Sequence, residues 1–429
     1  MTRSRYMVIV VFTIFFVISF ITNILGPIVP DIIESLHLSL FAVALLLFSF
    51  FIPYGILSIP AGFFVERFGE KPIILGFLST AMIGSLLFAW VHNYSVAVGS
   101  LFLIGSSMAA LEVAIIPLLR EAGGEEHFAF NSAFAQLIFG IASFVSPQLY
   151  SYVVHNLEQP INRDVLLTFL AHIVPSTMQW ISMYWIIALV IAAITPMLAL
   201  LRFPKVKRTQ EEASGTVGMY RSLLRRRVVW MYLFSVFFYV GSEQGTANWI
   251  SEFLWKYHGC DPHTEGATAV AWFWGLLTVG CLTGMILLKL FDSRSVLRVF
   301  GIGALLCLSA ALFGPASVAK VSFPCIGLFA SVMWPIIISL ALNSVPEYHG
   351  PLTGILCSGI MGGAILPLLI GRIADSIGLR TGMCLLYFSF GWVLAVSFWA
   401  KPLITNQRYG HRRHQSPRRD SKEAAFTRL

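Results

Sequence analysis

Apolar runs of about 20 residues recur along nearly the whole chain, separated by short segments that hold most charged residues. Crossing a hydrocarbon core about 30 Å thick takes about 20 apolar residues in a helix. Because lipid offers no hydrogen bonds to the backbone, each run has to satisfy its own N–H and C=O groups as a helix. The runs therefore predict an all-α integral membrane protein.

The composition agrees with this prediction and excludes several function classes. Apolar residues make up 57% of the 429 residues and charged residues only 12%, whereas soluble domains carry about 25% charged residues. The net charge of +8 comes from loops and tails, so no nucleic acid partner is expected. The six cysteines form no C-x-x-C pair, which indicates neither a metal site nor a disulfide framework. No cofactor and no enzyme activity are expected, because nucleophile–base sets and phosphate loops are missing.

Twelve spans are predicted, with a polar connector that divides them into six and six. The spans are 6–30, 40–63, 72–91, 96–119, 129–153, 179–201, 228–255, 266–290, 296–315, 318–344, 351–374 and 381–400. Residues 1–201 form an N-terminal bundle, 202–227 a cytoplasmic linker and 228–400 a C-terminal bundle. Residues 401–429 form a basic tail that is expected to be disordered.

The basic residues predict the orientation of the spans, because Lys and Arg near span ends are retained in the cytoplasm. If the N-terminus is inside, only 5 of the 29 Lys and Arg residues fall outside. These five are Arg163, Lys256, Lys320, Arg372 and Arg380. Both termini are therefore expected in the cytoplasm, in a monomeric protein of the cell (inner) membrane.

The two halves echo each other in the positions of their prolines. Pro117 and Pro147 of the first half take places parallel to Pro335 and Pro367 of the second. Repeated halves with interrupted helices are typical of secondary transporters, which build one central site between two bundles. Chance repetition in an apolar sequence is the alternative.

Two carboxylates lie about two helical turns or more from the nearer end of a predicted span, Glu112 in the fourth and Glu243 in the seventh. An ionisable side chain within a bilayer faces a cavity or a partner by default. Burial disfavours the charged form of a carboxylate, and no Lys or Arg lies at mid-depth in any predicted span to compensate. Each acid is thus a candidate for proton coupling and for solute binding. Alternatively, each is a protonated glutamate that ties neighbouring helices together.

Amides and indoles accompany the two acids and predict the chemistry of a solute. Amides donate and accept hydrogen bonds as vicinal hydroxyls require, and an indole face suits the C–H surface of a sugar. Helical spacing puts Gln244 and Asn248 near one face, with Trp249 at its edge. The candidate binding residues are Asn23, Glu112, Asn131, Gln136, Glu243, Gln244, Asn248, Trp249, Trp334 and Asn343.

The loop after the second span resembles a cytoplasmic signature of the major facilitator superfamily. The matching residues are Gly62, Glu66, Arg67, Gly69 and Lys71, with Glu66 in place of the usual Asp. The resemblance implies two six-helix bundles of the major facilitator fold and a gating role for these five residues.

Three stretches resemble the fucose permease branch of that superfamily: LEVAIIPLL (111–119), FFYVGSEQGTANWISEFL (237–254) and the segment 331–378. The resemblance implies proton-linked import of a hexose. It assigns sugar recognition and proton linkage to Glu112, and it matches Asn131 to a family asparagine while Gln136 is displaced in register. Gly26 stands where the fucose permease has an acid, so a titrating role passes to Glu112 or Glu243.

The sequence thus predicts a carrier that moves a small polar solute, a hexose, by alternating access as a proton symporter. Two other classes stay open. An exporter of amphipathic compounds would have a predominantly apolar cavity, and a non-transporting receptor on a carrier fold would depend on the basic tail.

Overall fold

Helices account for nearly all of the chain in the computed structural model, which describes residues 5–123, 128–158, 165–203, 217–345 and 349–400. The first half contains α1 (Arg5–Asn23), α2 (Leu25–Leu36), α3 (Leu40–Phe68), α4 (Glu70–Trp90), α5 (Tyr94–Gly123), α6 (Phe128–Glu158), α7 (Val165–Ile173), η2 (Gln179–Ile181) and α8 (Ser182–Leu200). The second half contains α9 (Val217–Leu224), α10 (Arg227–Ala247), α11 (Ile250–His258), η3 (Pro262–Gly266), α12 (Ala267–Leu290), α13 (Ser293–Phe313), α14 (Ala316–Ala330), α15 (Met333–Ser344), α16 (His349–Ser358), η4 (Gly359–Met361), α17 (Gly362–Ile377), α18 (Leu379–Met383) and α19 (Leu385–Trp399).

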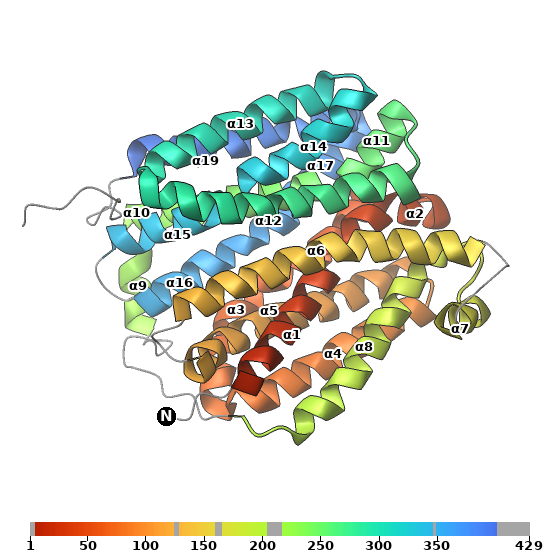
Figure 1. Cartoon of the computed structure of the whole chain (residues 1–429), viewed down its shortest axis with the longest axis horizontal. Helices are drawn as coiled ribbons and strands as arrows, with labels where there is room; N and C mark the ends of the chain where they lie inside the picture. The colour runs from red at the N-terminus through yellow and green to blue at the C-terminus, as the bar shows by residue number, and fades with distance from the viewer. Residues whose placement is uncertain (1–4, 124–127, 159–164, 204–216, 346–348, 401–429) are drawn as a thin grey trace, which may run out of the picture.

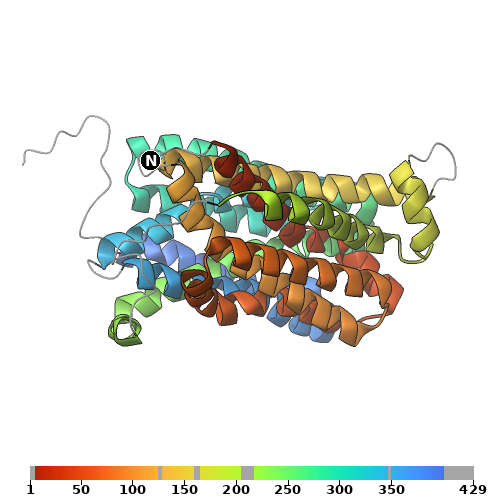
Figure 2. The same ribbon diagram turned by 90° about the horizontal axis from the view of Figure 1, so that it is seen from below.

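The long helices run side by side in two groups, with most of α1–α8 below and most of α10–α19 above in Figure 1. The view turned by 90° shows the same common direction of the helices (Figure 2). The two groups meet where α3 packs against α17 and α6 packs against α12. They correspond to the predicted N-terminal and C-terminal bundles, and the all-α membrane fold is confirmed.

Eleven segments of the described chain are long and apolar enough to cross a membrane. The α10–α11 segment is not among them, because the polar residues between Ser242 and Asn248 lower its hydropathy. It nevertheless lies in its bundle like the other spans (Figure 1), so the architecture is consistent with twelve crossings. The helices α7 and α9 are not predicted by the sequence, since each is too short to span.

Four predicted spans are broken at mid-depth rather than continuous. Pro27 cannot donate to the carbonyl of Asn23, where α1 ends. Pro335 likewise leaves the carbonyl of Ser331 free at the α14–α15 break, and that oxygen accepts from Cys281 Sγ at 3.4 Å. The other two breaks, at 248–249 and 359–361, contain no proline. Broken helices at this depth place polar backbone groups beside the space between the bundles.

The ends of the helices define two sides of the molecule. We call the end that holds the start of α1, α9 and the end of α19 the inner end, and the end that holds α2, α7 and α11 the outer end (Figure 1). With the predicted orientation, the inner end faces the cytoplasm.

Candidate functional site

Glu243 of α10 is the single residue between Tyr239 and Leu254 that is not buried. Its carboxylate accepts a hydrogen bond from the hydroxyl of Tyr239, one turn earlier on the same helix. The ring of Trp334, on α15, lies 6.1 Å from the ring of Tyr239. A carboxylate, a phenol and an indole therefore meet on the face of the C-terminal bundle where α10 approaches α15.

Glu112 of α5 has a comparable setting in the N-terminal bundle. From Ile104 to Ile115, only Glu112 and its neighbour Val113 are not buried. Tyr54 of α3 and Cys357 of α16 lie within electrostatic range of its carboxylate, and the residue is partly exposed. Because Cys357 belongs to the other bundle, Glu112 faces the boundary between the two bundles. No described residue forms a hydrogen bond with it.

Asn23 lies at the end of α1 and is 3% exposed. Its Nδ2 donates to the carbonyl of Ser19 at 3.1 Å and to Ser143 Oγ, on α6, at 2.8 Å. Its Oδ1 is buried with no hydrogen-bond partner among the described residues. Asn23 thus joins α1 to α6 and keeps one acceptor unused.

The amides and the indole that follow Glu243 are buried as well. Gln244, Asn248 and Trp249 are 4%, 2% and 0% exposed. Asn248 Nδ2 donates to Gln244 Oε1 at 3.4 Å, one turn away, and Trp249 Nε1 has no partner among the described residues. In this conformation Asn248 and Trp249 support the break between α10 and α11, whereas the side chain of Gln244 also approaches the carboxylate of Glu243.

Three further candidates lie in the inner half of the bundles. Gln136 is exposed and lies one turn before Gly140, whose backbone contacts Thr278 of α12. Its side chain therefore lies on the face of α6 that is turned toward the C-terminal bundle. Asn131 is half-buried near the inner start of α6, and Asn343 donates to Ser339 Oγ at 3.4 Å near the inner end of α15. The structure does not bring the latter two beside either acid.

Gly26 lies where the two bundles touch. A Cβ atom on this residue would lie 2.7 Å from the carbonyl oxygen of Ala247 on α10. Such contacts do not occur, so no side chain fits here without moving the bundles apart. The position that holds an acid in the fucose permease is thus occupied by a backbone contact in this structure.

The candidate gating residues form the turn between α3 and α4. Gly69 has φ 83°, a left-handed conformation that glycine adopts without a steric penalty. Lys71 Nζ donates to the carbonyls of Ala199 and Leu201 at 2.7 and 2.8 Å, at the end of α8. Lys71 therefore fastens the turn within the N-terminal bundle.

Of the other gating candidates, Arg67 lies over the ring of Phe68 at 5.4 Å. Gly62 lies seven residues before Gly69 on α3. The side chain of Glu66 lies outside the described part of the structure.

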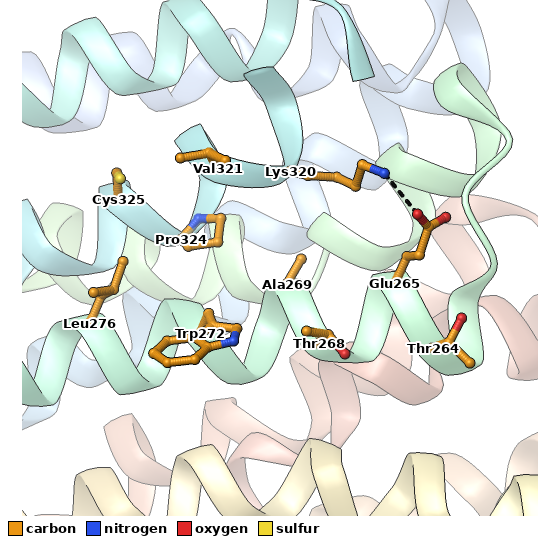
Figure 3. Close-up of a pocket in the computed structure, with 10 residues that line it drawn as sticks. All are labelled: Thr264, Glu265, Thr268, Ala269, Trp272, Leu276, Lys320, Val321, Pro324 and Cys325. Carbon is orange, nitrogen blue, oxygen red and sulfur yellow. Dashed lines mark hydrogen bonds and ion pairs between the residues drawn. The ribbon is translucent and has the colours of Figure 1, made fainter. Parts of the chain in front are cut away.

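A cavity of about 470 Å³ lies away from both acids, between α12 and α14 (Figure 3). Its lining residues are Thr264, Glu265, Thr268, Ala269, Trp272, Leu276, Lys320, Val321, Pro324 and Cys325. Lys320 Nζ pairs with Glu265 Oε1 at 2.7 Å at its outer mouth. Both helices belong to one bundle, so this cavity does not lie on a path between the bundles. Across the described residues, no three His, Cys, Asp or Glu side chains are grouped as metal ligands.

Tyr239, Tyr54, Cys281 and Cys357 are neighbours of the acids that sequence reasoning missed. Tyr239 precedes Glu243 by four residues, which places both on one helix face, so spacing alone could have found it. Tyr54 and Cys357 come from α3 and α16 and lie near Glu112 only through helix packing. Nothing in the local sequence marks that proximity.

The chain is similar to known membrane transporters over most of its length. The sequence profile of the Major Facilitator Superfamily matches residues 11–357. A glucose/galactose transporter of Brucella abortus is 29% identical over 395 residues, covering 88% of this chain and 91% of that protein. The L-fucose-proton symporter of Escherichia coli is 26% identical over 387 residues, covering 85% and 86%.

Solved structures share the fold. The crystal structure of the Escherichia coli fucose:proton symporter superposes with a TM-score of 0.65 at 19% identity, covering 92% of this chain and 98% of that one. A bacterial homolog of the human lysosomal transporter Spinster gives a TM-score of 0.71 at 14% identity, covering 92% and 96%.

Proposed function

We propose that this chain, which belongs to the Major Facilitator Superfamily and is a multi-pass membrane protein rather than an enzyme, is a proton-linked hexose carrier. The observation that carries the proposal is the pair of accessible carboxylates. In each bundle, one glutamate is partly exposed within a stretch of helix that is otherwise buried, apart from Val113 beside Glu112. A carrier that works by alternating access needs such groups between its bundles, and a protein that only packs helices together does not.

The side chains around Glu243 suit a sugar. A carboxylate accepts hydrogen bonds from hydroxyl groups, and such charge-assisted bonds are about twice as strong as neutral ones. The rings of Tyr239 and Trp334 offer an apolar wall at the same place. The names of the similar proteins, a glucose/galactose transporter and an L-fucose-proton symporter, support a hexose.

Proton linkage is assigned to Glu112. This carboxylate has no hydrogen-bond partner among the described residues, so its protonation state changes without disrupting another contact. Gly26 has no side chain and provides no acid at the position that the resemblance to the fucose permease marks. In a symporter, a carboxylate that is loaded with a proton on one side and releases it on the other couples the two fluxes.

Export of amphipathic compounds is the competing function, and the apolar cavity between α12 and α14 is the feature that would suit it. That cavity lies within one bundle and has neither acid in its lining. A carrier of hexoses and an exporter of lipophilic compounds therefore differ in which molecules stabilise the purified protein.

The test is transport by protein reconstituted in liposomes. We expect an acidic exterior to drive uptake of radiolabelled galactose, glucose or fucose, and we expect the solute to alkalinise the exterior as protons enter with it. Glu112→Gln is expected to abolish this proton-driven uptake, and Glu252→Gln is its matched control, since Glu252 is a buried glutamate (3% exposed) of α11 at the outer end. Sugar uptake at a rate independent of the pH gradient would reject proton linkage. Stabilisation of the purified protein against heat by lipophilic compounds, and not by hexoses, would reject the sugar as substrate.

A further inference from the structure

The segment 62–71, which holds the candidate gating residues, has a counterpart with the same spacing at the outer end of the molecule. In the first copy, Gly62 is followed by an acid after four residues, a glycine after three more and a base after two more. The segment 371–380 has the same spacing of glycine, acid, glycine and base, at Gly371, Asp375, Gly378 and Arg380.

The backbone of the two copies is alike. The helix α3 ends at Phe68 and α4 begins at Glu70, while α17 ends at Ile377 and α18 begins at Leu379. The single residues between them, Gly69 and Gly378, have φ 83° and φ 95°. Because α3 runs from the outer to the inner end and α17 runs the other way, one turn lies at each end of the molecule.

The base of each copy holds its turn to its own bundle. Lys71 binds the carbonyls at the end of α8, as described above. Arg380 lies over the ring of Tyr257 of α11 at 4.7 Å, and its backbone N–H donates to the Tyr257 hydroxyl at 3.1 Å. Both turns are thus fastened within the bundle to which they belong.

The acid of the second copy crosses to the other bundle. Asp375 Oδ1 accepts from the backbone N–H of Leu40 at 2.8 Å, and Oδ2 accepts from that of Phe41 at 2.9 Å. These are the first two amides of α3, which have no partner inside the helix. The positive end of the helix dipole further favours a carboxylate here.

The helices approach closely at this contact. A Cβ atom on Gly371 would lie 2.6 Å from Ala44 Cβ and 2.7 Å from the carbonyl oxygen of Leu40. A second contact between the bundles joins His263 Nε2 of η3 to Asp31 Oδ1 of α2 at 2.7 Å. Three hydrogen bonds therefore join the described residues of the two bundles, and all three lie at the outer end.

We propose that Asp375 is the latch that holds the outer end closed, with the His263–Asp31 pair as a second fastening. The proposal rests on alternating access in the proposed function, because opening outward has to pull Asp375 away from α3. The amides of Leu40 and Phe41 and the carboxylate of Asp375 then form hydrogen bonds with water instead of with one another. Removing the carboxylate therefore shifts the population toward an open outer end.

The experiment is hydrogen exchange measured by mass spectrometry on the whole protein in lipid nanodiscs. In Asp375→Ala, we expect exchange to become about tenfold faster in the first turn of α3, because this turn loses the carboxylate that caps its first two amides. We also expect faster exchange in peptides covering 26–36 and 261–268, which touch across the bundles but lie away from Asp375 in sequence. Asp375→Asn keeps one acceptor and is expected to fall between.

Ser39→Ala is the matched control. Ser39 Oγ accepts from the backbone N–H of Ala42 at 3.1 Å, so it caps the same helix from within its own bundle. We expect this variant to speed exchange only in the first turn of α3. If Asp375→Ala has the same local effect and leaves 26–36 and 261–268 unchanged, Asp375 is a cap and the latch is wrong.

Exchange in 297–312, inside α13, reports whether a variant is folded and is expected to stay as in the parent protein. Because no solute is added, this outcome is independent of the transport assay. The exchange experiment can therefore support the role of Asp375 even if the protein transports no sugar. It can also reject that role if the protein does transport sugar.

Discussion

The two bundles each present one accessible glutamate, and the two glutamates differ in how they are held. Glu243 accepts a hydrogen bond from Tyr239 of its own helix. Glu112 has no hydrogen-bond partner among the described residues, and one of its neighbours, Cys357, belongs to the opposite bundle. One acid is oriented by its own helix, whereas the surroundings of the other change whenever the bundles move.

This difference separates two tasks that a coupled carrier has to perform. An oriented acceptor gives the solute a fixed geometry, because its rotamer is already held by a donor. A carboxylate at the boundary between the bundles is alternately closed and opened to each side, as proton coupling requires. In the proposed function, Glu243 therefore serves mainly in solute recognition and Glu112 mainly in proton transfer.

Glu112→Gln is expected to have the largest effect. Proton-driven uptake should fall to background, since the amide of glutamine cannot take up and release the coupled proton. Exchange of solute across liposomes without a pH gradient should persist, because it needs no net proton movement. Initial rates of both processes measure the split, and equal loss of both would show that Glu112 is a binding residue only.

The pH profile sharpens the same comparison. Since proton loading requires a protonated carboxylate, parent uptake should decline as the external pH rises, and Glu112→Gln should flatten that decline in whatever transport remains. A profile that is flattened by Glu243→Gln and not by Glu112→Gln would reverse the assignment.

Gly26→Ala is expected to have the next largest effect. The new methyl group meets the carbonyl of Ala247, and overpacking of this kind costs about 1–3 kcal/mol. The melting temperature should fall and exchange in α2 should rise. Gly99→Ala, where the methyl group meets open space, is the control; equal behaviour of the two variants would show that the contact between Gly26 and Ala247 is not tight.

Tyr239→Phe removes the hydroxyl that donates to Glu243 and leaves the carboxylate in place. Losing the donor is expected to weaken solute binding about fivefold, for a hydrogen bond worth about 1 kcal/mol, with the pH dependence of transport unchanged. Tyr232→Phe is the control on the same helix, since its hydroxyl bonds to Ser344 Oγ at 2.8 Å instead. Calorimetric titration of both variants measures the difference, and an unaltered affinity in Tyr239→Phe would contradict the proposed role.

Asn248→Ala should have the smallest effect on binding. Asn248 is buried against Gln244, so we expect the free energy of unfolding to fall by about 1 kcal/mol while solute affinity changes little. Asn156→Ala is the control, because the Asn156 side chain bonds only to the carbonyl of Tyr152 on an exposed face. A large loss of affinity in Asn248→Ala would bring this amide back into the solute site.

The spans were predictable because each helix in a bilayer has to be long enough and apolar enough on its own to cross the hydrocarbon core. Length and hydropathy are local properties, so they can be read from one segment at a time. Pro27 and Pro335 also predict their helix breaks, since a proline has no N–H to donate to the carbonyl four residues earlier. The break at Asn248 and Trp249 has no such marker.

The site was predictable only in part. The two glutamates stand out because ionisable residues within spans are rare, and the structure leaves both accessible. The burial of Gln244 and Trp249 depends on how α10 and α11 pack, and the approach of Cys357 to Glu112 depends on how the bundles meet. These are contacts between distant segments, which a single sequence does not record. Asp375 was detectable in principle, because its spacing repeats that of Glu66.

The one-residue connection at Gly69 also has a consequence for how the protein is made. A single residue spans about 3.5 Å, so α3 and α4 cannot enter the bilayer one after the other with slack between them. We expect them to insert together as a hairpin, and with the predicted orientation Arg67 and Lys71 keep its tip in the cytoplasm. Lengthening this connection should therefore impair biogenesis before it impairs transport.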